Sequence, residues 1–275
     1  MNIKIAVDSS SNLRPADGLA VVPLKIVTDQ REFVDDPSLD TAEMMEYIES
    51  YKGRSGTSCP SVGDWLEAFG DSEAVFAVAI TRNLSGCHNA ALQAAQVYLE
   101  QHPDRRVCCL DTLTTGPELA LIVEKLQALV AENLDFDAIQ AQIQAYMATT
   151  HMAFMLKSVE NLAKNGRVSH LVAKAVGFLN IHIVGVASEE GTFQQLHKAR
   201  GEAKGLRLLV AEMEKRGYQG GKVRITHCFN EAAAIELEAL LRTIAPEADI
   251  TIVPSTGLCS FYAERGSIMV GFEGE

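Results

Sequence analysis

The sequence predicts an α/β protein of two domains, an N-terminal domain on a parallel doubly wound sheet and a C-terminal α+β domain with a mixed sheet. Short apolar strands alternate with helical segments through residues 1–148, and this alternation is typical of a parallel sheet covered by helices on both faces. Residues 181–196 have the pattern of a β-hairpin, which adds antiparallel pairing in the second half. The chain has 275 residues, 47% of them hydrophobic, enough for two hydrophobic cores. We therefore expect one domain at residues 1–155 and the other at residues 156–275.

The first half is expected to supply the strands and helices of the parallel sheet. Strands are expected at residues 3–7, 21–27, 74–80 and 106–110. Helices are expected at residues 41–51, 62–69 and 87–100, followed by two more up to about residue 148. The strand at 74–80 is apolar throughout, as expected when both faces of a sheet are covered. In the helix at 87–100 small apolar residues recur on one face, so it should pack closely against the sheet.

The second half follows a different pattern. The hairpin at 181–196 turns at Glu189-Glu190-Gly191, where a glycine suits a tight turn. A long amphipathic helix is expected at 200–216, a β-α-β unit at 222–253 and a last strand at 267–272. A hairpin beside a β-α-β unit implies a mixed sheet, which is the basis for the α+β prediction.

The composition limits the expected partners. The chain carries 36 acidic and 24 basic residues for a net charge of −12, and no basic stripe offsets this balance, so nucleic acid is not an expected partner. No apolar run is long enough for a membrane span, which leaves at most transient membrane contact. The first residues enter an apolar strand without a signal-peptide layout, and the six cysteines form no CxxC pair. We therefore expect a reduced, cytoplasmic protein.

Two short segments rich in hydroxyl groups give the strongest functional signal. The first is Thr57-Ser58-Cys59-Pro60-Ser61, and the second, after the strand at 74–80, is Asn83-Leu84-Ser85-Gly86. At the ends of parallel strands, side-chain O–H and backbone N–H donors gather at one edge of a sheet, which suits a small anionic group. Gly86 would let such a group approach the backbone closely.

These hydroxyls also have purely structural interpretations. Ser85 can cap the helix that begins near residue 87. Ser61 is expected to cap the helix at 62–69, with Asp64 three residues later completing a capping box. Thr57 and Ser58 have no such local role, so their hydroxyls are the more suggestive of a ligand.

Two other positions are candidates for the same site. Ser255-Thr256-Gly257 follows the strand expected at 249–253 and repeats the pattern of hydroxyls at a strand end. Arg167 could supply a positive charge, although a lone arginine is more often a solvated surface residue. The sequence contains no G-x-S-x-G, P-loop, G-x-G-x-x-G or H-E-x-x-H motif and no zinc-ligand spacing, so we expect no catalytic residue, metal or cofactor.

Taken together, several short motifs resemble the DegV family over nearly the whole chain. Each motif is a weak family signal by itself, but their order and spacing along the chain match those of the family. The matching stretches are Lys4-Ile5-Ala6-Val7-Asp8-Ser9-Ser10, Val22-Pro23-Leu24, Thr57-Ser58-Cys59-Pro60-Ser61, Leu84-Ser85-Gly86, Asp111-Thr112, Asn161-Leu162-Ala163-Lys164-Asn165-Gly166-Arg167-Val168, Lys198-Ala199-Arg200-Gly201 and Thr226-His227-Cys228.

The resemblance implies a protein that binds one long-chain fatty acid such as palmitate, with the carboxylate at the domain junction and the acyl chain in an apolar slot. Thr57 and Ser85 resemble the hydroxyls that hold the carboxylate, and Arg167 resembles a nearby basic residue. Some members present their fatty acid to a separate kinase, and Lys198 and Arg200 resemble basic positions of that docking face.

One departure from the family concerns the turn Ser255-Thr256-Gly257. Many members carry a histidine where this chain has Ser255, which can donate a hydrogen bond but carries no charge.

Two alternatives from other classes remain open at this stage. A serine-dependent acyl hydrolase or acyltransferase could use Ser58 or Ser85 as its nucleophile, but such a serine needs an adjacent base. The nearest histidine in sequence is His88, which is expected on the first helical turn facing solvent. The other alternative is an interaction module without a ligand.

Overall fold

A parallel sheet forms the core of the N-terminal half, in a computed structural model that describes residues 2–169 and 180–275. Its strand order is β2-β1-β6-β7, and all neighbours run parallel. The strands are β1 (Ile3–Asp8), β2 (Leu19–Val22), β6 (Ala74–Ala79) and β7 (Arg106–Asp111). Every residue of β6 is buried, because this strand lies inside the sheet with helices on both faces.

Helices cover the two faces of this sheet with separate apolar cores. One face packs against α2 (Val62–Phe69) and α3 (Cys87–Gln101), and the other against α4 (Gly116–Ala131) and α5 (Phe136–Met147). Alternate residues of each strand point to opposite faces, so Phe76 packs on Phe136 of α5 while Ala77 lies in the core with α3. The predicted doubly wound sheet is confirmed.

A small antiparallel sheet corrects the prediction for residues 21–27. Pro23 separates β2 from β3 (Lys25–Thr28), and β3 leaves the parallel sheet to pair with β4 (Glu32–Val34) and β5 (Ser55–Ser58). Proline lacks the N–H needed to continue a strand within a sheet, which explains the break. Thr57 therefore lies in an antiparallel strand, where we had expected a turn. After it, Ser61 caps α2 with Asp64 in the predicted capping box.

The second half forms a mixed six-stranded sheet in the order β10-β9-β8-β13-β11-β12. Its strands are β8 (Thr150–Leu156), β9 (Ile181–Ala187), β10 (Phe193–Arg200), β11 (Val223–His227), β12 (Ile250–Pro254) and β13 (Ile268–Glu273). Only β11 and β12 pair in parallel, and α8 (Glu202–Glu214) and α9 (Glu231–Ile244) cover one face. The predicted mixed sheet is confirmed, whereas β8 was missed. The predicted domain boundary between residues 155 and 156 stays a prediction. The first strand of the second sheet, β8, begins before it, at Thr150.

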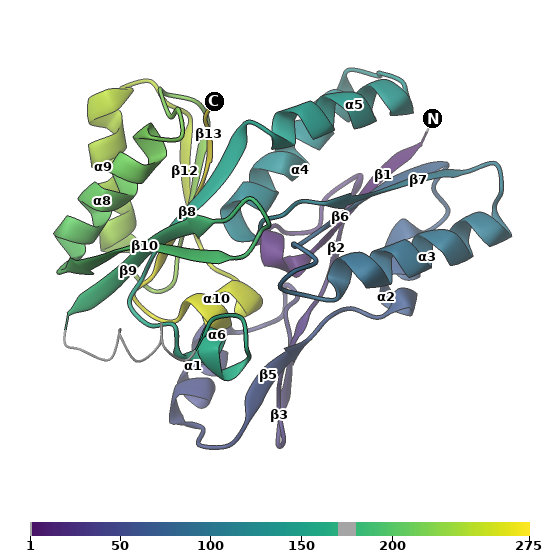
Figure 1. Cartoon of the computed structure of the whole chain (residues 1–275). Coiled ribbons are helices and arrows are strands. Elements are labelled where there is room, and N and C mark those ends of the chain that lie inside the picture. The colour runs from purple at the N-terminus through teal and green to yellow at the C-terminus, as the bar shows by residue number, and fades with distance from the viewer. Residues whose placement is uncertain (1, 170–179) are drawn as a thin grey trace.

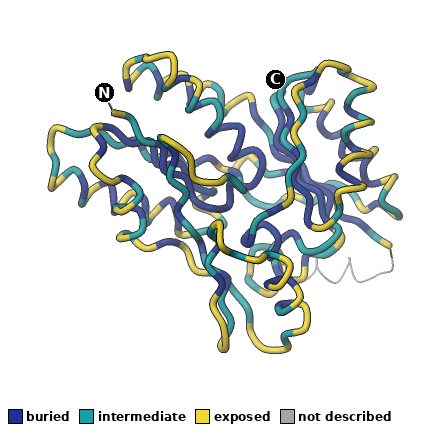
Figure 2. Tube along the Cα trace, turned by 180° about the vertical axis from the view of Figure 1, so that it is seen from behind, coloured by how far each residue is buried: buried dark blue, intermediate teal, exposed yellow. Residues whose placement is uncertain are grey.

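The two sheets lie side by side, with α1 (Thr41–Ser50), α6 (Glu160–Lys164), α10 (Gly257–Ala263) and the small sheet below them (Figure 1). Each of these two sheets with its helices forms one lobe of the molecule. The buried residues form continuous bands along the strands of both lobes (Figure 2). Helix α4 packs on the parallel sheet and also contacts β13, β11 and β8. It is therefore shared by both lobes.

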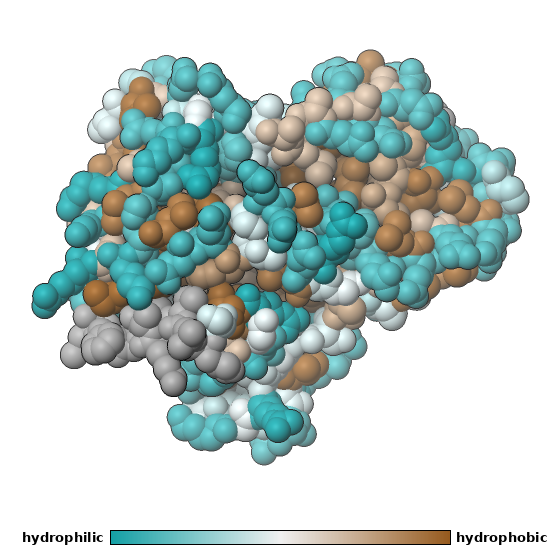
Figure 3. Space-filling view, viewed as in Figure 1, coloured by the Kyte–Doolittle hydropathy of each residue, from teal (hydrophilic) through white to brown (hydrophobic). Residues whose placement is uncertain are grey.

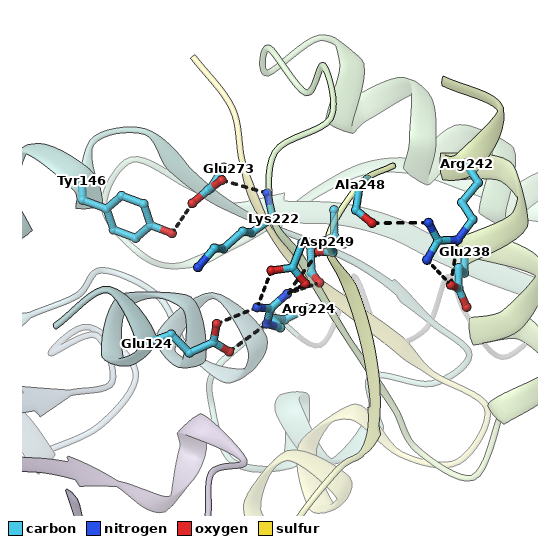
Figure 4. Close-up of polar contacts among 10 residues, drawn as sticks. Glu124, Tyr146, Lys222, Arg224, Glu238, Arg242, Ala248, Asp249 and Glu273 are labelled. Carbon is cyan, nitrogen blue, oxygen red and sulfur yellow. Dashed lines mark hydrogen bonds and ion pairs between the residues drawn. The ribbon is translucent and has the colours of Figure 1, made fainter. Parts of the chain in front are cut away.

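Ion pairs reinforce this junction midway along α4. Arg224 of β11 lies between Glu124 of α4 and Asp249, with both guanidinium edges engaged (Figure 4). In the same region the Tyr146 hydroxyl of α5 donates to Glu273 of β13 over 2.7 Å. These contacts join the N-terminal helices to the second sheet.

Glu118 in the first turn of α4 is a fully buried acid at the same junction. Its carboxylate accepts the hydroxyls of Thr114 over 2.5 Å and of Thr150 over 2.9 Å. Burial raises the pKa of Glu118 from 4.5 to about 7, against the opposing effect of the two hydrogen bonds. The folded protein thus holds a proton on Glu118 at pH values where the unfolded chain has released it.

We expect this proton to make the folded state less stable as pH rises. Between about pH 5 and 7.5 Glu118 should lower the free energy of unfolding by roughly 2 kcal/mol, because the unfolded carboxyl ionises first. Glu118→Gln removes the titrating group, so this part of the pH dependence should disappear in urea unfolding curves. The exposed Glu67→Gln is the matched control and should keep the slope of the unchanged protein. A Glu118→Gln variant with that same slope would contradict the assignment.

Candidate functional site

An apolar cavity of about 110 Å³ lies between the two sheets. A water molecule needs about 10–15 Å³ of such space, so the cavity has room for a chain of several heavy atoms. Its walls come from the loops that follow β2, β6 and β7 and from strands β8, β9, β10 and β13. It therefore opens at the carboxyl edge of the parallel sheet, where ligands bind in many α/β proteins.

One wall of the cavity is supplied by the second sheet. Met152, Phe154 and Leu156 alternate along β8 and face the cavity, and Phe193 of β10 stacks on Phe154 with ring centroids 4.8 Å apart. Met269 of β13 continues the wall. Methionine and aromatic side chains of this kind fit around a long apolar group.

The β9–β10 hairpin tip closes the cavity against the first lobe. Ala187, Gly191, Thr192 and Phe193 line it, and Asn83 Nδ2 donates to the Glu190 carbonyl over 2.6 Å. Gly191 has φ +71°, and a Cβ there would lie 2.5 Å from the Leu113 carbonyl oxygen. Glycine is therefore required for this close approach.

Four polar side chains gather at one end of the cavity. Thr57, Ser85, Arg167 and Tyr262 all line it. The Thr57 and Tyr262 hydroxyls are hydrogen-bonded over 2.8 Å, and the Arg167 guanidinium lies 5.6 Å from the centre of the Tyr262 ring. Ser85 precedes α3, and its hydroxyl accepts weakly from the Cys87 N–H over 3.4 Å. This end offers three hydroxyls and one cation.

Backbone carbonyls hold the Arg167 side chain in place. Its Nε donates to Leu84 O over 3.2 Å and its Nη1 to Asn165 O over 2.7 Å. Across residues 2–169 and 180–275 no carboxylate lies within ion-pair distance of Arg167. A half-buried guanidinium without a carboxylate partner is well suited to an anionic ligand.

Comparison with known proteins decides the family. The family model for uncharacterised proteins of the DegV family matches residues 2–275. This chain belongs to the DegV family. A DegV domain-containing protein of Streptococcus pneumoniae (strain ATCC BAA-255 / R6) is 42% identical over 279 residues, which cover 99% of this chain and 99% of that protein.

Solved DegV structures match the same fold. A DegV family protein from Eubacterium eligens loaded with heptadecanoic acid superposes with a TM-score of 0.97 at 42% identity, over 99% of this chain and 100% of that one. The Streptococcus pneumoniae Fatty Acid Kinase (Fak) B3 protein loaded with linoleic acid gives a TM-score of 0.97 at 42% identity, over 100% of both chains. A DegV family protein from Ruminococcus gnavus refined with vaccenic acid has 27% identity and a TM-score of 0.90, over 98% of this chain and 99% of that one.

Three of the residues predicted for the DegV head-group site line the cavity, namely Thr57, Ser85 and Arg167. Ser58 and Gly86 do not line it. The Ser58 side chain is exposed and donates to the Cys59 carbonyl, and a Cβ on Gly86 would lie 3.1 Å from Cys59 Sγ. Both therefore lie beside the site, on its outer side.

Ser255 and Thr256 also lie outside the cavity lining. The Ser255 hydroxyl bonds to the Ser260 hydroxyl over 2.6 Å, and the Thr256 hydroxyl donates to Asn12 Oδ1 over 3.2 Å. Both hydroxyls have partners within the protein. The turn that they form leads into α10, and α10 carries Tyr262 into the cavity.

Asp35 fixes the start of α10. Its carboxylate accepts the N–H groups of Gly257 over 2.7 Å and Leu258 over 3.0 Å. Burial raises the pKa of Asp35, and these backbone hydrogen bonds oppose the rise. The carboxylate therefore anchors the short helix that bears Tyr262.

Tyr262 and the β8 side chains are among the lining residues that sequence reasoning missed. The only local signal for Tyr262 is an aromatic pair, Phe261-Tyr262, five residues after the Thr256 turn. Phe261 is fully buried whereas Tyr262 is not, so the pair straddles the boundary of the core.

The geometry does not assemble a serine nucleophile. The Ser85 hydroxyl lies 3.1 Å from Cys87 Sγ, and no histidine or carboxylate bonds to the Ser58 or Ser85 hydroxyl within residues 2–169 and 180–275. The prediction that His88 faces solvent was wrong. Its side chain is buried, and burial lowers its pKa. Within the same residues, no group of His, Cys, Asp and Glu could hold a metal ion.

Proposed function

We propose that this protein binds one long-chain fatty acid, with the carboxylate at Thr57, Ser85 and Arg167 and the acyl chain between the two sheets. The observation that carries this proposal is an apolar cavity whose polar end combines hydroxyls with a guanidinium that has no carboxylate partner among the described residues. Its DegV relatives from Eubacterium eligens and Streptococcus pneumoniae were solved with heptadecanoic and linoleic acid. Mass spectrometry of lipid extracted from the denatured protein tests the proposal, and the absence of any fatty acid would overturn it.

The acyl chain should supply most of the affinity. Burying about fourteen methylenes at ~0.8 kcal/mol each gives roughly 11 kcal/mol before the costs of association. Each hydrogen bond to the charged head group adds about 1.5–3 kcal/mol. A protein with a net charge of −12 can therefore bind an anionic lipid with only one cation at the head group.

We also propose that the protein is a carrier without turnover, because within residues 2–169 and 180–275 no base bonds to either candidate serine. One solved relative is a fatty acid kinase B3 protein, and presentation of the acid to a kinase is the corresponding role here. Lys198 and Arg200 are exposed on the edge strand β10 and are the proposed contacts for that partner. The test is an assay of hydrolysis with a chromogenic ester. Hydrolysis by the unchanged protein that is lost in Ser85→Ala would contradict the carrier role.

The cellular setting is a further part of the proposal. All six cysteines are free, which fits a reduced cytoplasm. Within the described residues no helix is both long and apolar enough to cross a bilayer. The apolar residues visible in Figure 3 form scattered groups on a mostly hydrophilic face, which fits at most transient membrane contact.

A double variant of the head-group hydroxyls should weaken lipid retention without unfolding the protein. Thr57→Val with Ser85→Ala removes two donors to the carboxylate at about 1.5–3 kcal/mol each, so the expected loss of fatty-acid affinity is at least about 100-fold. Ser58→Ala is the matched control, because its hydroxyl is exposed outside the cavity. The measurements are fatty-acid dissociation constants and the thermal midpoints of the lipid-free proteins. Equal affinity in the double variant and the control would contradict the head-group assignment.

A further inference from the structure

Tyr262 connects the separate pieces of the polar end. It lies on α10, its hydroxyl bonds to the Thr57 hydroxyl on β5 over 2.8 Å, and its ring lies 5.6 Å from the Arg167 guanidinium. Thr57 and Tyr262 are 205 residues apart in the chain. The phenol is therefore the contact that joins α10 to the strand carrying a proposed ligand hydroxyl.

The direction of this hydrogen bond follows from the chemistry of a carboxylate. Either hydroxyl can donate in the structure as it stands. An ionised carboxylate only accepts, and a threonine hydroxyl has a single hydrogen. If Thr57 donates to the carboxylate, its oxygen can still accept, and the Tyr262 phenol is the donor within reach.

We propose that Tyr262 is a positioning residue, whose phenol donates to Thr57 Oγ1 and thereby directs the Thr57 hydrogen to the carboxylate of the ligand. The inference rests on the proposed function and extends it to a relay of two hydroxyls. Hydrogen bonds in such a chain polarise one another, so the Thr57 hydroxyl becomes a stronger donor than it would be alone.

Two features of the structure prepare Tyr262 for this role. Its surroundings keep the phenol protonated, because burial raises its pKa and outweighs the opposing effects of Thr57 and Arg167. Its helix is fixed at both ends. Asp35 holds the first N–H groups of α10, and Asn161 Nδ2 donates to the Phe261 carbonyl over 2.8 Å.

A double-mutant cycle on Tyr262 and Thr57 tests the relay. Tyr262→Phe retains the ring beside Arg167 and removes only the hydroxyl. We expect it to weaken palmitate binding about five- to tenfold in the unchanged background and less than about twofold in a Thr57→Val background. For hexadecanol, which has no charged head group, the change should also stay below about twofold. Tyr218→Phe is the matched control, since its buried hydroxyl has no hydrogen-bond partner in the described part of the chain and lies outside the cavity.

The outcomes separate the relay from other roles. Equal losses in both backgrounds would mean that Tyr262 contacts the ligand directly, which overturns the inference. Equal losses for palmitate and hexadecanol would point to a purely structural role and overturn it as well. If Tyr262→Phe binds palmitate with full affinity, the relay is wrong while the proposed function still holds. If the unchanged protein binds no palmitate, the proposed function falls and the relay falls with it.

Discussion

An Ala187→Trp variant is expected to lose more than about 100-fold in affinity for a sixteen-carbon fatty acid. Ala187 ends β9 and lines the cavity between the sheets, so an indole there would occupy space that the acyl chain needs. Excluding four methylenes costs about 3 kcal/mol at ~0.8 kcal/mol each, and 2.7 kcal/mol already corresponds to about 100-fold. Isothermal titration of the delipidated protein with palmitate measures the loss.

Chain length and a neighbouring position provide the controls for this variant. Shorter acids such as octanoate need less of the cavity, so their affinities should fall less than that of palmitate. Gln194→Trp adds the same side chain at an exposed position beside Phe193 on β10 and should bind palmitate normally. Normal palmitate binding in Ala187→Trp would show that the chain does not pass Ala187, and it would contradict the proposed slot.

The elements that sequence predicted correctly are those with a strong local pattern. The unbroken apolar run of β6, the capping box of α2 and the left-handed turn conformation of Gly191 each depend on a few neighbouring residues. In contrast, β8 was missed. Its neighbours in the sheet are β9 and β13, and the pairing with β13 depends on residues more than a hundred positions away.

The same distinction between local and long-range signals applies to the residues of the candidate site. Thr57 and Ser85 could be found because short segments rich in hydroxyls are visible in the sequence, and Arg167 could be found because it lies in a motif that resembles the family. Ser255 and Thr256 had the same local appearance, but the structure gives their hydroxyls partners inside the protein. Tyr262 could not be found, since its partner lies 205 residues away and the sequence does not show which face of α10 meets β5.

The largest expected effect on stability comes from Gly271→Ala in β13. A Cβ at this position would lie 2.3 Å from the Glu118 backbone nitrogen and 2.5 Å from its Cα. These are backbone atoms in the first turn of α4, so no side-chain rotation can relieve the clash. Helix α4 must move away from the second sheet or β13 must bend. Overpacking of this kind typically costs about 1–3 kcal/mol and occasionally more, and we expect at least 3 kcal/mol here because only backbone can yield.

Urea unfolding of Gly271→Ala measures this cost, with Gly63→Ala as the matched control. Gly63 lies in α2, and the nearest atom to an added Cβ there is Ser61 Oγ at 3.6 Å, an ordinary contact. Alanine favours helix over glycine by up to about 1 kcal/mol, so the control should be neutral or slightly stabilised. Fatty-acid affinity should also fall in Gly271→Ala and should stay unchanged in Gly63→Ala. The reason is that Met269 on β13 and Thr115 just before α4 line the cavity between the two sheets. An unfolding midpoint in Gly271→Ala equal to that of the unchanged protein would mean that α4 and β13 are not in direct backbone contact, and the shared position of α4 between the two lobes would be wrong.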